Sequence, residues 1–443
     1  MGETVRVTSG ELRGVDCGNY VVYKGVPYAK PPVGELRWRA PQALEPWEGV
    51  YEATEFRGRC MQDDPAGPPW DKDFYDDPSY LPDATEDCLY LHIWAPKDVE
   101  NAPVALWIHG GAFMGGYAFE KEFDGAAYAA RGIIMVSVEY RCNVFGYLAH
   151  PWLTAEAGIS GNYGTLDQIA ALTWVRDNIA AFGGDPANIT VFGQSAGAMS
   201  TQTLVSSPMA KGMIAKAILQ SGGSYGVGLH RDMPLSEQEH YGEYFAEVAG
   251  VQSLEEMRAL SANRVLALIP LFFQKAMPEA QGLFLTPTMD GKVLDEGYYE
   301  VMDDGNIADI PYILGSTKDD ILVEPSMERP EDKPLYQGSV AFSHKLDELG
   351  RKPAYMYYFT RDLPGDDQGA WHSSELWYTM GTLDRCWRPW TDADHALAER
   401  ILDYWANFMK TGDPNGEGLP AWKPCDREES FVMELDVMDT EEK

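Results

Sequence analysis

The sequence has few of the features that mark a membrane protein, a nucleic-acid-binding protein or a disulfide scaffold. None of its apolar runs approaches the roughly 18 residues that span a bilayer, so we expect a soluble globular protein without a membrane partner. Basic residues number only 35 against 69 acidic ones, and the net charge of −34 argues against nucleic acid or an anionic membrane as a partner. Six cysteines in 443 residues are too few for a disulfide scaffold.

The chain also lacks internal repeats, low-complexity linkers and an N-terminal basic segment followed by an apolar core. The first two absences predict a single domain over residues 1–443. The third favours a cytoplasmic location, and a secreted mature form whose leader was replaced by a start Met stays open. No heptad pattern or apolar stripe indicates an oligomer, which leaves a monomer or a homodimer.

What the chain does contain is a succession of apolar runs separated by helical patterns. The runs are typical of strands buried on both faces, and they lie at 88–94, 104–109, 133–138, 189–192, 217–220, 312–315 and 354–359. Helical periodicity occurs at 167–182 and at 394–410. The alternation predicts an α/β fold with a mostly parallel sheet covered by helices on both faces.

Two other regions complete this outline. Residues 5–14 and 19–28 look like two paired strands near the start of the chain. A more polar helical pattern between about 230 and 305 follows the central strands. We expect this second region to form a helical cap or side layer beside the sheet.

The stretch around Ser195 organises the rest of the chain. The motif Gly-Gln-Ser-Ala-Gly at 193–197 lies between the strand 189–192 and a helix that begins at Ala196. A serine on such a sharp strand-to-helix turn needs small neighbours, and its hydroxyl projects at the top of the sheet. The motif therefore predicts Ser195 as a nucleophile.

An activated serine also requires donors for the oxyanion of the reaction. After the strand 104–108 the chain continues His-Gly-Gly-Ala at 109–112, and these small residues let backbone N–H groups converge on one point. Gly111 and Ala112, together with Ala196 after the nucleophile, are the expected donors.

The base is expected among the histidines that follow the nucleophile. His372 lies in a polar loop just beyond the strand 354–359, from which it can reach over the sheet edge. His344 and His395 lie in helical patterns, where a solvated or capping role is expected. We therefore predict His372 as the base.

The acid is expected at the end of the strand 312–315. A carboxylate there can hydrogen-bond the imidazole and fix its tautomer. Asp319 and Asp320 both follow this strand, and their spacing alone does not separate them.

These residues resemble the type-B carboxylesterases, the family that includes bacterial broad-specificity esterases, cholinesterases and neuroligins. The resemblance covers nearly the whole chain, through motifs at 23–32, 36–38, 86–94, 140–146, 161–197, 220–222, 404–408 and 412–416. It implies an α/β-hydrolase fold and the hydrolysis of carboxylic esters without a cofactor or metal. The family's acid is usually a Glu, and its position aligns with Asp320.

Several departures from the family pattern affect what is expected. Gln194 stands where cholinesterases carry Glu, which weakens a choline-ester interpretation. The segment 321–371 between the acid and the base is shorter than usual, which predicts a shallower and more open site. Cys60 and Cys88 match a disulfide of secreted members, so the resemblance implies a bridge only in an oxidising compartment.

The predicted function is that of a serine carboxylesterase, with broad specificity for short-chain esters as small-molecule substrates. An alternative is a hydroxycinnamoyl esterase, for which Trp70, Trp371 and Trp377 are candidate walls. A neuroligin-like binding protein would require a lost nucleophile or base, and a dehalogenase or epoxide hydrolase would need a carboxylate in place of Ser195. We also expect the acidic loop 61–87 to edge the site entrance and to disfavour anionic esters.

Overall fold

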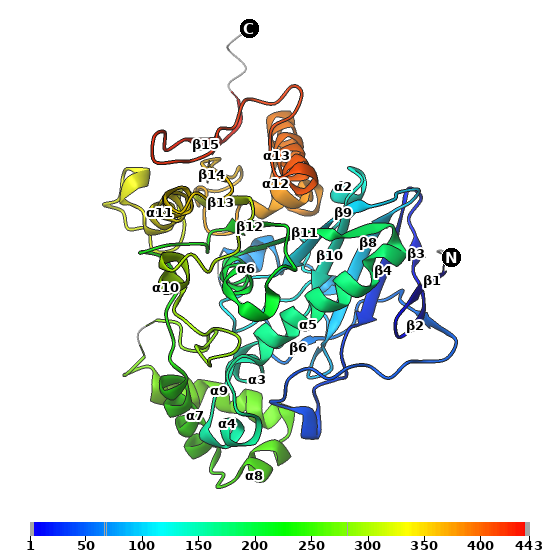
Figure 1. Cartoon of the computed structure of the whole chain (residues 1–443), viewed down its shortest axis with the longest axis vertical. Helices are drawn as coiled ribbons and strands as arrows, with labels where there is room; N and C mark the ends of the chain where they lie inside the picture. The colour runs from blue at the N-terminus through cyan, green and yellow to red at the C-terminus, as the bar shows by residue number, and fades with distance from the viewer. Residues whose placement is uncertain (1–3, 66, 68, 281, 439–443) are drawn as a thin grey trace.

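The computed structural model describes residues 4–65, 67, 69–280 and 282–438. In this part of the chain ten strands form one large sheet, in the order β15-β14-β13-β12-β11-β9-β10-β8-β4-β3 (Figure 1). Their bounds are β3 Val15–Asp16, β4 Tyr20–Pro27, β8 Tyr90–Pro96, β9 Ala102–Ile108, β10 Ile134–Val138, β11 Gly184–Gln194, β12 Lys216–Gln220, β13 Tyr312–Thr317, β14 Ala354–Phe359 and β15 Val432–Leu435. Every neighbouring pair from β10 to β15 is parallel, whereas β8, β4 and β3 extend the sheet in antiparallel fashion. The predicted mostly parallel sheet is confirmed.

Helices cover both faces of this sheet because its central strands are apolar on both sides. On β9, Trp107 packs into the core beneath α12 and α13, while Leu106 and Ile108 pack into the core on the opposite face, with α5 and α6 (Figure 1). The helices are α1 Trp70–Asp73, α2 Ala126–Ala129, α3 Asn143–Tyr147, α4 Pro151–Ala157, α5 Tyr163–Asn178, α6 Ala196–Ser206, α7 Leu235–Ala249, α8 Leu254–Ala259, α9 Ala262–Ala276, α10 Tyr298–Asp303, α11 Pro334–Glu348, α12 Leu376–Met380 and α13 Asp392–Thr411. The predicted helices at 167–182 and 394–410 correspond to α5, with a short 3-10 turn after it, and to α13.

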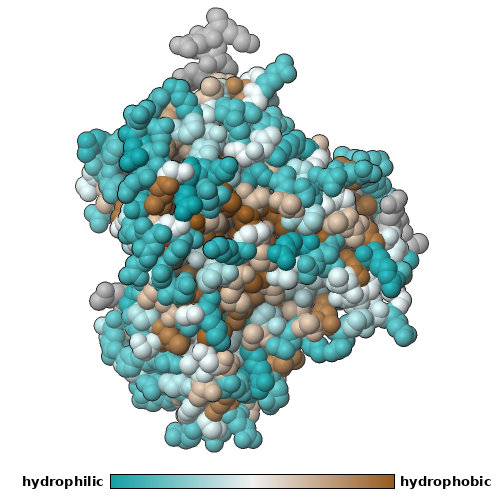
Figure 2. Space-filling model, viewed as in Figure 1, coloured by the Kyte–Doolittle hydropathy of each residue, from teal (hydrophilic) through white to brown (hydrophobic). Residues whose placement is uncertain are grey.

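The region predicted as a cap contains α7 to α10. Figure 1 shows α7, α8 and α9 gathered at one end of the molecule, away from α13. Figure 2 shows apolar side chains in the middle of this face, between these two ends, within a largely hydrophilic surface. The shortened segment 321–371 carries α11 and β14. The division into a single domain with a cap stays a prediction.

The interpretation of the N-terminal strands is wrong in one respect. Residues 5–14 form two short strands, β1 (Thr4–Val7) and β2 (Gly10–Arg13), which pair with each other and not with β4. The chain reverses at Thr8 and Ser9, where the turn residue Gly10 adopts a φ of +153° against the Trp47 ring. These strands join β5 (Val50–Glu52) in a separate sheet, and β6 (Arg59–Cys60) pairs with β7 (Ala84–Thr85) in another.

The cysteines, all of which lie within the described residues, are free thiols. Cys60 and Cys88 are both buried and hydrogen-bonded to each other, but they are not bridged. Cys60 Sγ also accepts a hydrogen bond from the backbone N–H of Cys142 at 3.1 Å. The disulfide implied by the family resemblance is therefore not formed in this structure.

No helix among the described residues combines the length and the apolar character that crossing a membrane requires.

A buried ion pair fastens α5 to the loop that follows β10. Arg141 donates from Nε and Nη2 to the Asp167 carboxylate at 2.8 and 2.7 Å, and its backbone N–H donates to the same group at 3.1 Å. The two side chains are 3% and 0% exposed. Two parallel N–H donors matched to a carboxylate fix both distance and orientation, so this pair positions the layer beneath β9 and β11.

Replacing Asp167 by Asn is expected to lower the free energy of unfolding by about 3–5 kcal/mol, because the Arg141 charge then stays in the interior without its partner. Equilibrium urea unfolding measures the change. As a control, Glu11→Gln breaks the Arg6–Glu11 pair, whose side chains are 78% and 40% exposed, and should cost less than about 1 kcal/mol. Similar losses in the two variants would contradict the role of the buried pair.

Candidate active site

Ser195 lies on a strained turn between β11 and α6. Its φ of +56° and ψ of −125° are uncommon for a residue with a side chain, and the turn persists because the surrounding backbone leaves no alternative. A Cβ on Gly197 would overlap the Ile108 carbonyl oxygen, and one on Gly193 would lie 2.7 Å from the same oxygen. The two glycines of the motif are therefore required by close packing against the end of β9.

The loop after β9 passes directly beside this turn. A Cβ on Gly110 would lie 2.9 Å from the carbonyl oxygen of Gln194 and 3.3 Å from Cβ of Ser195. Gly111 and Ala112 follow with φ of +103° and +54°. Among the described residues, the N–H groups of Gly111 and Ala112 donate to no other group.

The first-turn N–H groups of α6, beginning at Ala196, have no intrahelical acceptor either. The three predicted donors thus come from two segments that meet at Ser195. Such an arrangement can bind an oxyanion.

His372 and Asp320 are brought together by β13 and the loop after β14. His372 Nδ1 forms a short hydrogen bond with Asp320 Oδ1, and both side chains are buried. Asp320 Oδ2 accepts from Ser221 Oγ at 2.7 Å and from the Thr317 N–H at 3.0 Å. These contacts hold one oxygen of the carboxylate on the imidazole and direct Nε2 of the ring toward the nucleophile turn, where it contacts Gln194.

The electrostatics of this pair follow from the contacts. Burial alone would raise the pKa of Asp320, but the charge and hydrogen bonds of His372 and Ser221 hold it below its usual range. Burial alone would lower the pKa of His372, but the Asp320 carboxylate raises it above its usual value. The pair is therefore built to stabilise an imidazolium.

Asp319, which sequence alone did not separate from Asp320, has a different position. Its side chain is exposed, and Oδ2 accepts from the Ala370 N–H at 3.0 Å. Its own N–H donates to the Ala370 carbonyl at 2.9 Å. Asp319 thus fastens the loop that carries His372 but does not touch the imidazole ring.

Two further side chains lie close to this centre. Gln194 Nε2 lies 3.2 Å from His372 Nε2. Glu375 is buried near the Asp320–His372 pair, and burial, followed by the Asp320 charge, raises its pKa to about 7. The position of Gln194 before the nucleophile was a usable signal, but its contact with the base depends on the fold.

One cavity of about 580 Å³ joins these groups. Gly110, Gly111, Ala112, Ser195 and His372 all line it. The acidic loop 61–87 forms part of its wall through the residues Gln62, Asp63, Pro65, Trp70, Phe74 and Tyr75. The loop therefore borders the cavity, whereas its expected position at the entrance and its effect on anionic esters stay predictions. We call this space the Ser195 cavity.

The tryptophans proposed as walls have different positions. Trp70 lines the Ser195 cavity. Trp371 is buried behind it, with ring centroids 6.3 Å apart, and Trp377 is fully buried in the core beneath α13. The prediction is therefore wrong for Trp371 and Trp377, because aromatic side chains of this size fill the space between layers.

Two buried carboxyl groups also line the Ser195 cavity. Glu120 accepts from the Tyr75 hydroxyl and from the Tyr117 N–H, each at 2.9 Å. Glu122 lies next to it, and burial together with the Glu120 charge raises the Glu122 pKa well above its usual range.

Comparison with known proteins identifies the family. The model of the carboxylesterase family matches residues 2–347 and 328–443. The chain belongs to the carboxylesterase family. The para-nitrobenzyl esterase of Bacillus subtilis (strain 168) is 33% identical to this carboxylesterase over 98% of its chain and 95% of the relative. The fumonisin B1 esterase of Sphingopyxis macrogoltabida is 37% identical over 70% of this chain and 55% of the relative.

Solved structures agree with this assignment. A thermophilic PNB esterase has a TM-score of 0.87 at 32% identity, covering 99% of this chain and 96% of that one. The Geobacillus stearothermophilus carboxylesterase has a TM-score of 0.81 at 30% identity, covering 98% and 96%. The predicted α/β-hydrolase fold and the predicted carboxylic ester hydrolase activity are confirmed, and neither the hydroxycinnamoyl esterase nor the neuroligin-like alternative is favoured.

Replacing Asp320 by Asn in this carboxylesterase is expected to lower kcat by about 10⁴-fold, because the imidazole loses its orientation and its counter-charge. The pKa of His372 should fall, so the acid limb of the pH profile of kcat/KM should move to lower pH. Asp319→Asn is the matched control and should keep most of the activity, because the Asp319 carboxylate contacts the Ala370 N–H and Lys318 rather than the imidazole. The reverse ranking of the two variants would make Asp319 the acid.

Replacing Gln194 by Glu is expected to place a carboxylate next to His372 Nε2 and to stabilise the imidazolium. The pKa of His372 should therefore rise, and the acid limb of kcat/KM should move to higher pH by about one unit or more. A pH profile from 5 to 9 measures the shift. An unchanged profile would show that the contact between Gln194 and His372 is not made in solution.

Proposed function

We propose that Ser195 is the nucleophile of this carboxylesterase, with His372 as its base and Asp320 as the acid that orients the base. Gly111, Ala112 and Ala196 donate their backbone N–H groups to the oxyanion. The observation that carries the proposal is the hydrogen bond between His372 Nδ1 and Asp320 in the cavity that Ser195 and the glycine loop line. The contact between Gln194 Nε2 and His372 Nε2 at 3.2 Å is released when the ring nitrogen takes the serine proton.

The chemistry follows from these positions. His372 accepts the Ser195 proton while the serine oxygen attacks the ester carbonyl, and the resulting oxyanion is held by the three N–H groups. The alcohol leaves with the proton from His372, which forms an acyl-enzyme. Water then loses a proton to His372 and attacks the acyl group, releasing the carboxylic acid and restoring Ser195.

We infer broad specificity for neutral short-chain esters, because the cavity is modest in volume and its walls near Ser195 are mainly small or apolar. A cytoplasmic location is supported by the free thiols of Cys60 and Cys88, which a reducing compartment would maintain. A monomer or a homodimer, with no nucleic acid or membrane partner, is the expected state given the net charge of −34.

Replacing Ser195 by Ala is expected to lower kcat/KM for p-nitrophenyl esters by about 10⁵- to 10⁶-fold, because no other group can form the acyl-enzyme. The measurement uses a series from acetate to dodecanoate with methyl ferulate added, and the wild type should prefer the short chains. Ser200→Ala, on the same helix, is the control, because the Ser200 hydroxyl accepts from Gln168 and lies outside the cavity. Full activity of Ser195→Ala would contradict the proposal that Ser195 is the nucleophile.

A further inference from the structure

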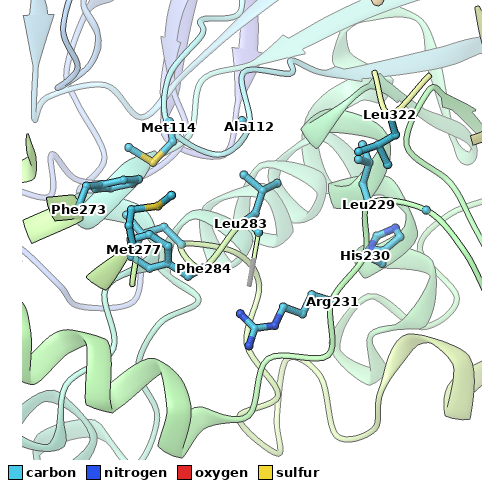
Figure 3. Close-up of a pocket in the computed structure, with 13 residues that line it drawn as sticks. Ala112, Met114, Leu229, His230, Arg231, Phe273, Met277, Leu283, Phe284 and Leu322 are labelled. Carbon is cyan, nitrogen blue, oxygen red and sulfur yellow. The ribbon is translucent and has the colours of Figure 1, made fainter. Parts of the chain in front are cut away.

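A second cavity lies beside the Ser195 cavity. Its volume is about 640 Å³, and it is bounded by the loop 112–114 on one side and by residues after β12 and around α9 on the others (Figure 3). Most of its wall is apolar, as the side chains of Phe273, Met277 and Phe284 show. We call it the Arg231 cavity, after the charged residue in its wall.

The two cavities share part of their walls. Ala112 and Met114 line both of them. On α9, Leu266 and Ile269 line the Ser195 cavity, and Phe273, one helical turn further, lines the Arg231 cavity. An ester held with its carbonyl at the Ala112 N–H therefore lies directly beside the Arg231 cavity.

Arg231 is the one cation in the wall of this cavity among the described residues. His230 also lines it but stays neutral, because burial lowers its pKa to about 3. Figure 3 shows Arg231 on the side of the cavity opposite Ala112 and Met114. Its charge therefore lies toward the far end of an arm that starts at the oxyanion loop.

The Arg231 guanidinium is only partly satisfied by the protein. Nη2 forms an ion pair with Glu237, which is also held by the Tyr241 hydroxyl at 3.1 Å. Nη1 is buried and has no acceptor among the described residues. The side chain as a whole is 24% exposed, so a ligand carboxylate in the cavity can approach the guanidinium charge and form a charge-assisted hydrogen bond with it.

The two cavities also differ in the sign of their charges. Carboxyl groups of Asp63, Glu120 and Glu122 line the Ser195 cavity away from the loop 112–114. The Arg231 cavity contains no carboxylate among its described lining residues. A substrate with one anionic end is therefore directed by charge toward the Arg231 cavity.

We propose that the Arg231 cavity is a specificity subsite for esters in which one arm is an apolar chain ending in a carboxylate. The Arg231 guanidinium pairs with that carboxylate, while the apolar wall holds the methylene chain. The substrate class is that of half-esters of dicarboxylic acids or esters of ω-hydroxy acids, which share this chemistry on the acyl arm or on the alcohol arm. The inference rests on the proposed role of Ser195.

The experiment compares matched pairs of esters that differ only at the tip of one arm. On the acyl arm, p-nitrophenyl hexanoate is compared with the mono-p-nitrophenyl ester of adipic acid. On the alcohol arm, hexyl butyrate is compared with 5-carboxypentyl butyrate. Arg231→Gln should lower kcat/KM for the carboxylate ester of one pair by about 10- to 100-fold, mainly through KM, and leave the neutral esters nearly unchanged. The arm that responds identifies which part of the ester enters the cavity.

Two further variants keep the test decisive. Glu237→Gln removes the counter-charge of Arg231 and should raise kcat/KM for the same carboxylate ester. Lys275→Gln is the control, because it removes a cation from α9 that pairs with Glu247 and does not line the cavity.

The proposal is overturned if Arg231→Gln affects the carboxylate esters no more than Lys275→Gln does, or if it weakens neutral and anionic esters equally. In both cases hydrolysis of the neutral esters through Ser195 would stand. If the wild type hydrolyses none of the neutral esters, the assignment of Ser195 itself fails and this inference fails with it.

Discussion

The close approach of two neighbouring strand ends is the constraint on which the active site depends. Gly193 on β11 pairs with Ile108 on β9, and the Ile108 carbonyl oxygen occupies the space that a Cβ on Gly197 would need. This contact sets the turn at Ser195 against the loop at Gly110 at the same level of the sheet. Parallel pairing places both turns at the carboxyl ends of their strands, so the nucleophile and the oxyanion donors need no long-range adjustment to meet.

The active site also contains several buried carboxyl groups that are unfavourable in their charged form. Burial raises the pKa values of Glu120, Glu122 and Glu375, all of which lie in or beneath the Ser195 cavity. Groups that resist ionisation in this way destabilise the fold at neutral pH whenever they must be charged. Ordinary cores avoid such groups, and their concentration around one cavity is typical of functional sites.

The sequence alone predicted those parts of the structure that depend on a local pattern of residues. Continuous apolar runs located the strands from β8 to β14, and the glycines at 193 and 197 located the turn at Ser195, because both depend on neighbouring residues. The choice between Asp319 and Asp320 depends on which side of one loop faces His372, and the family resemblance rather than spacing favoured Asp320. The hairpin at Thr8 and Ser9 was missed because its two short strands look like one.

The positions of the tryptophans and the existence of the Arg231 cavity could not be predicted from the sequence, for a different reason. Trp377 and Trp70 have the same chemistry, and only the packing of α12 and α13 places one in the core and leaves the other in the cavity wall. The Arg231 cavity is assembled from segments separated by more than a hundred residues along the chain, from Ala112 to Leu322. No periodicity or motif links such segments.

Ala112 has a consequence for how this enzyme can diversify. It holds a left-handed backbone conformation that glycine adopts without strain, and its methyl group stands where the two cavities meet. A change of size at this position alters the space for the acyl arm and for the alcohol arm together, so selection there is pleiotropic. Positions such as Trp70 and Arg231 each border a single cavity, and natural variation at them can tune one arm independently of the other.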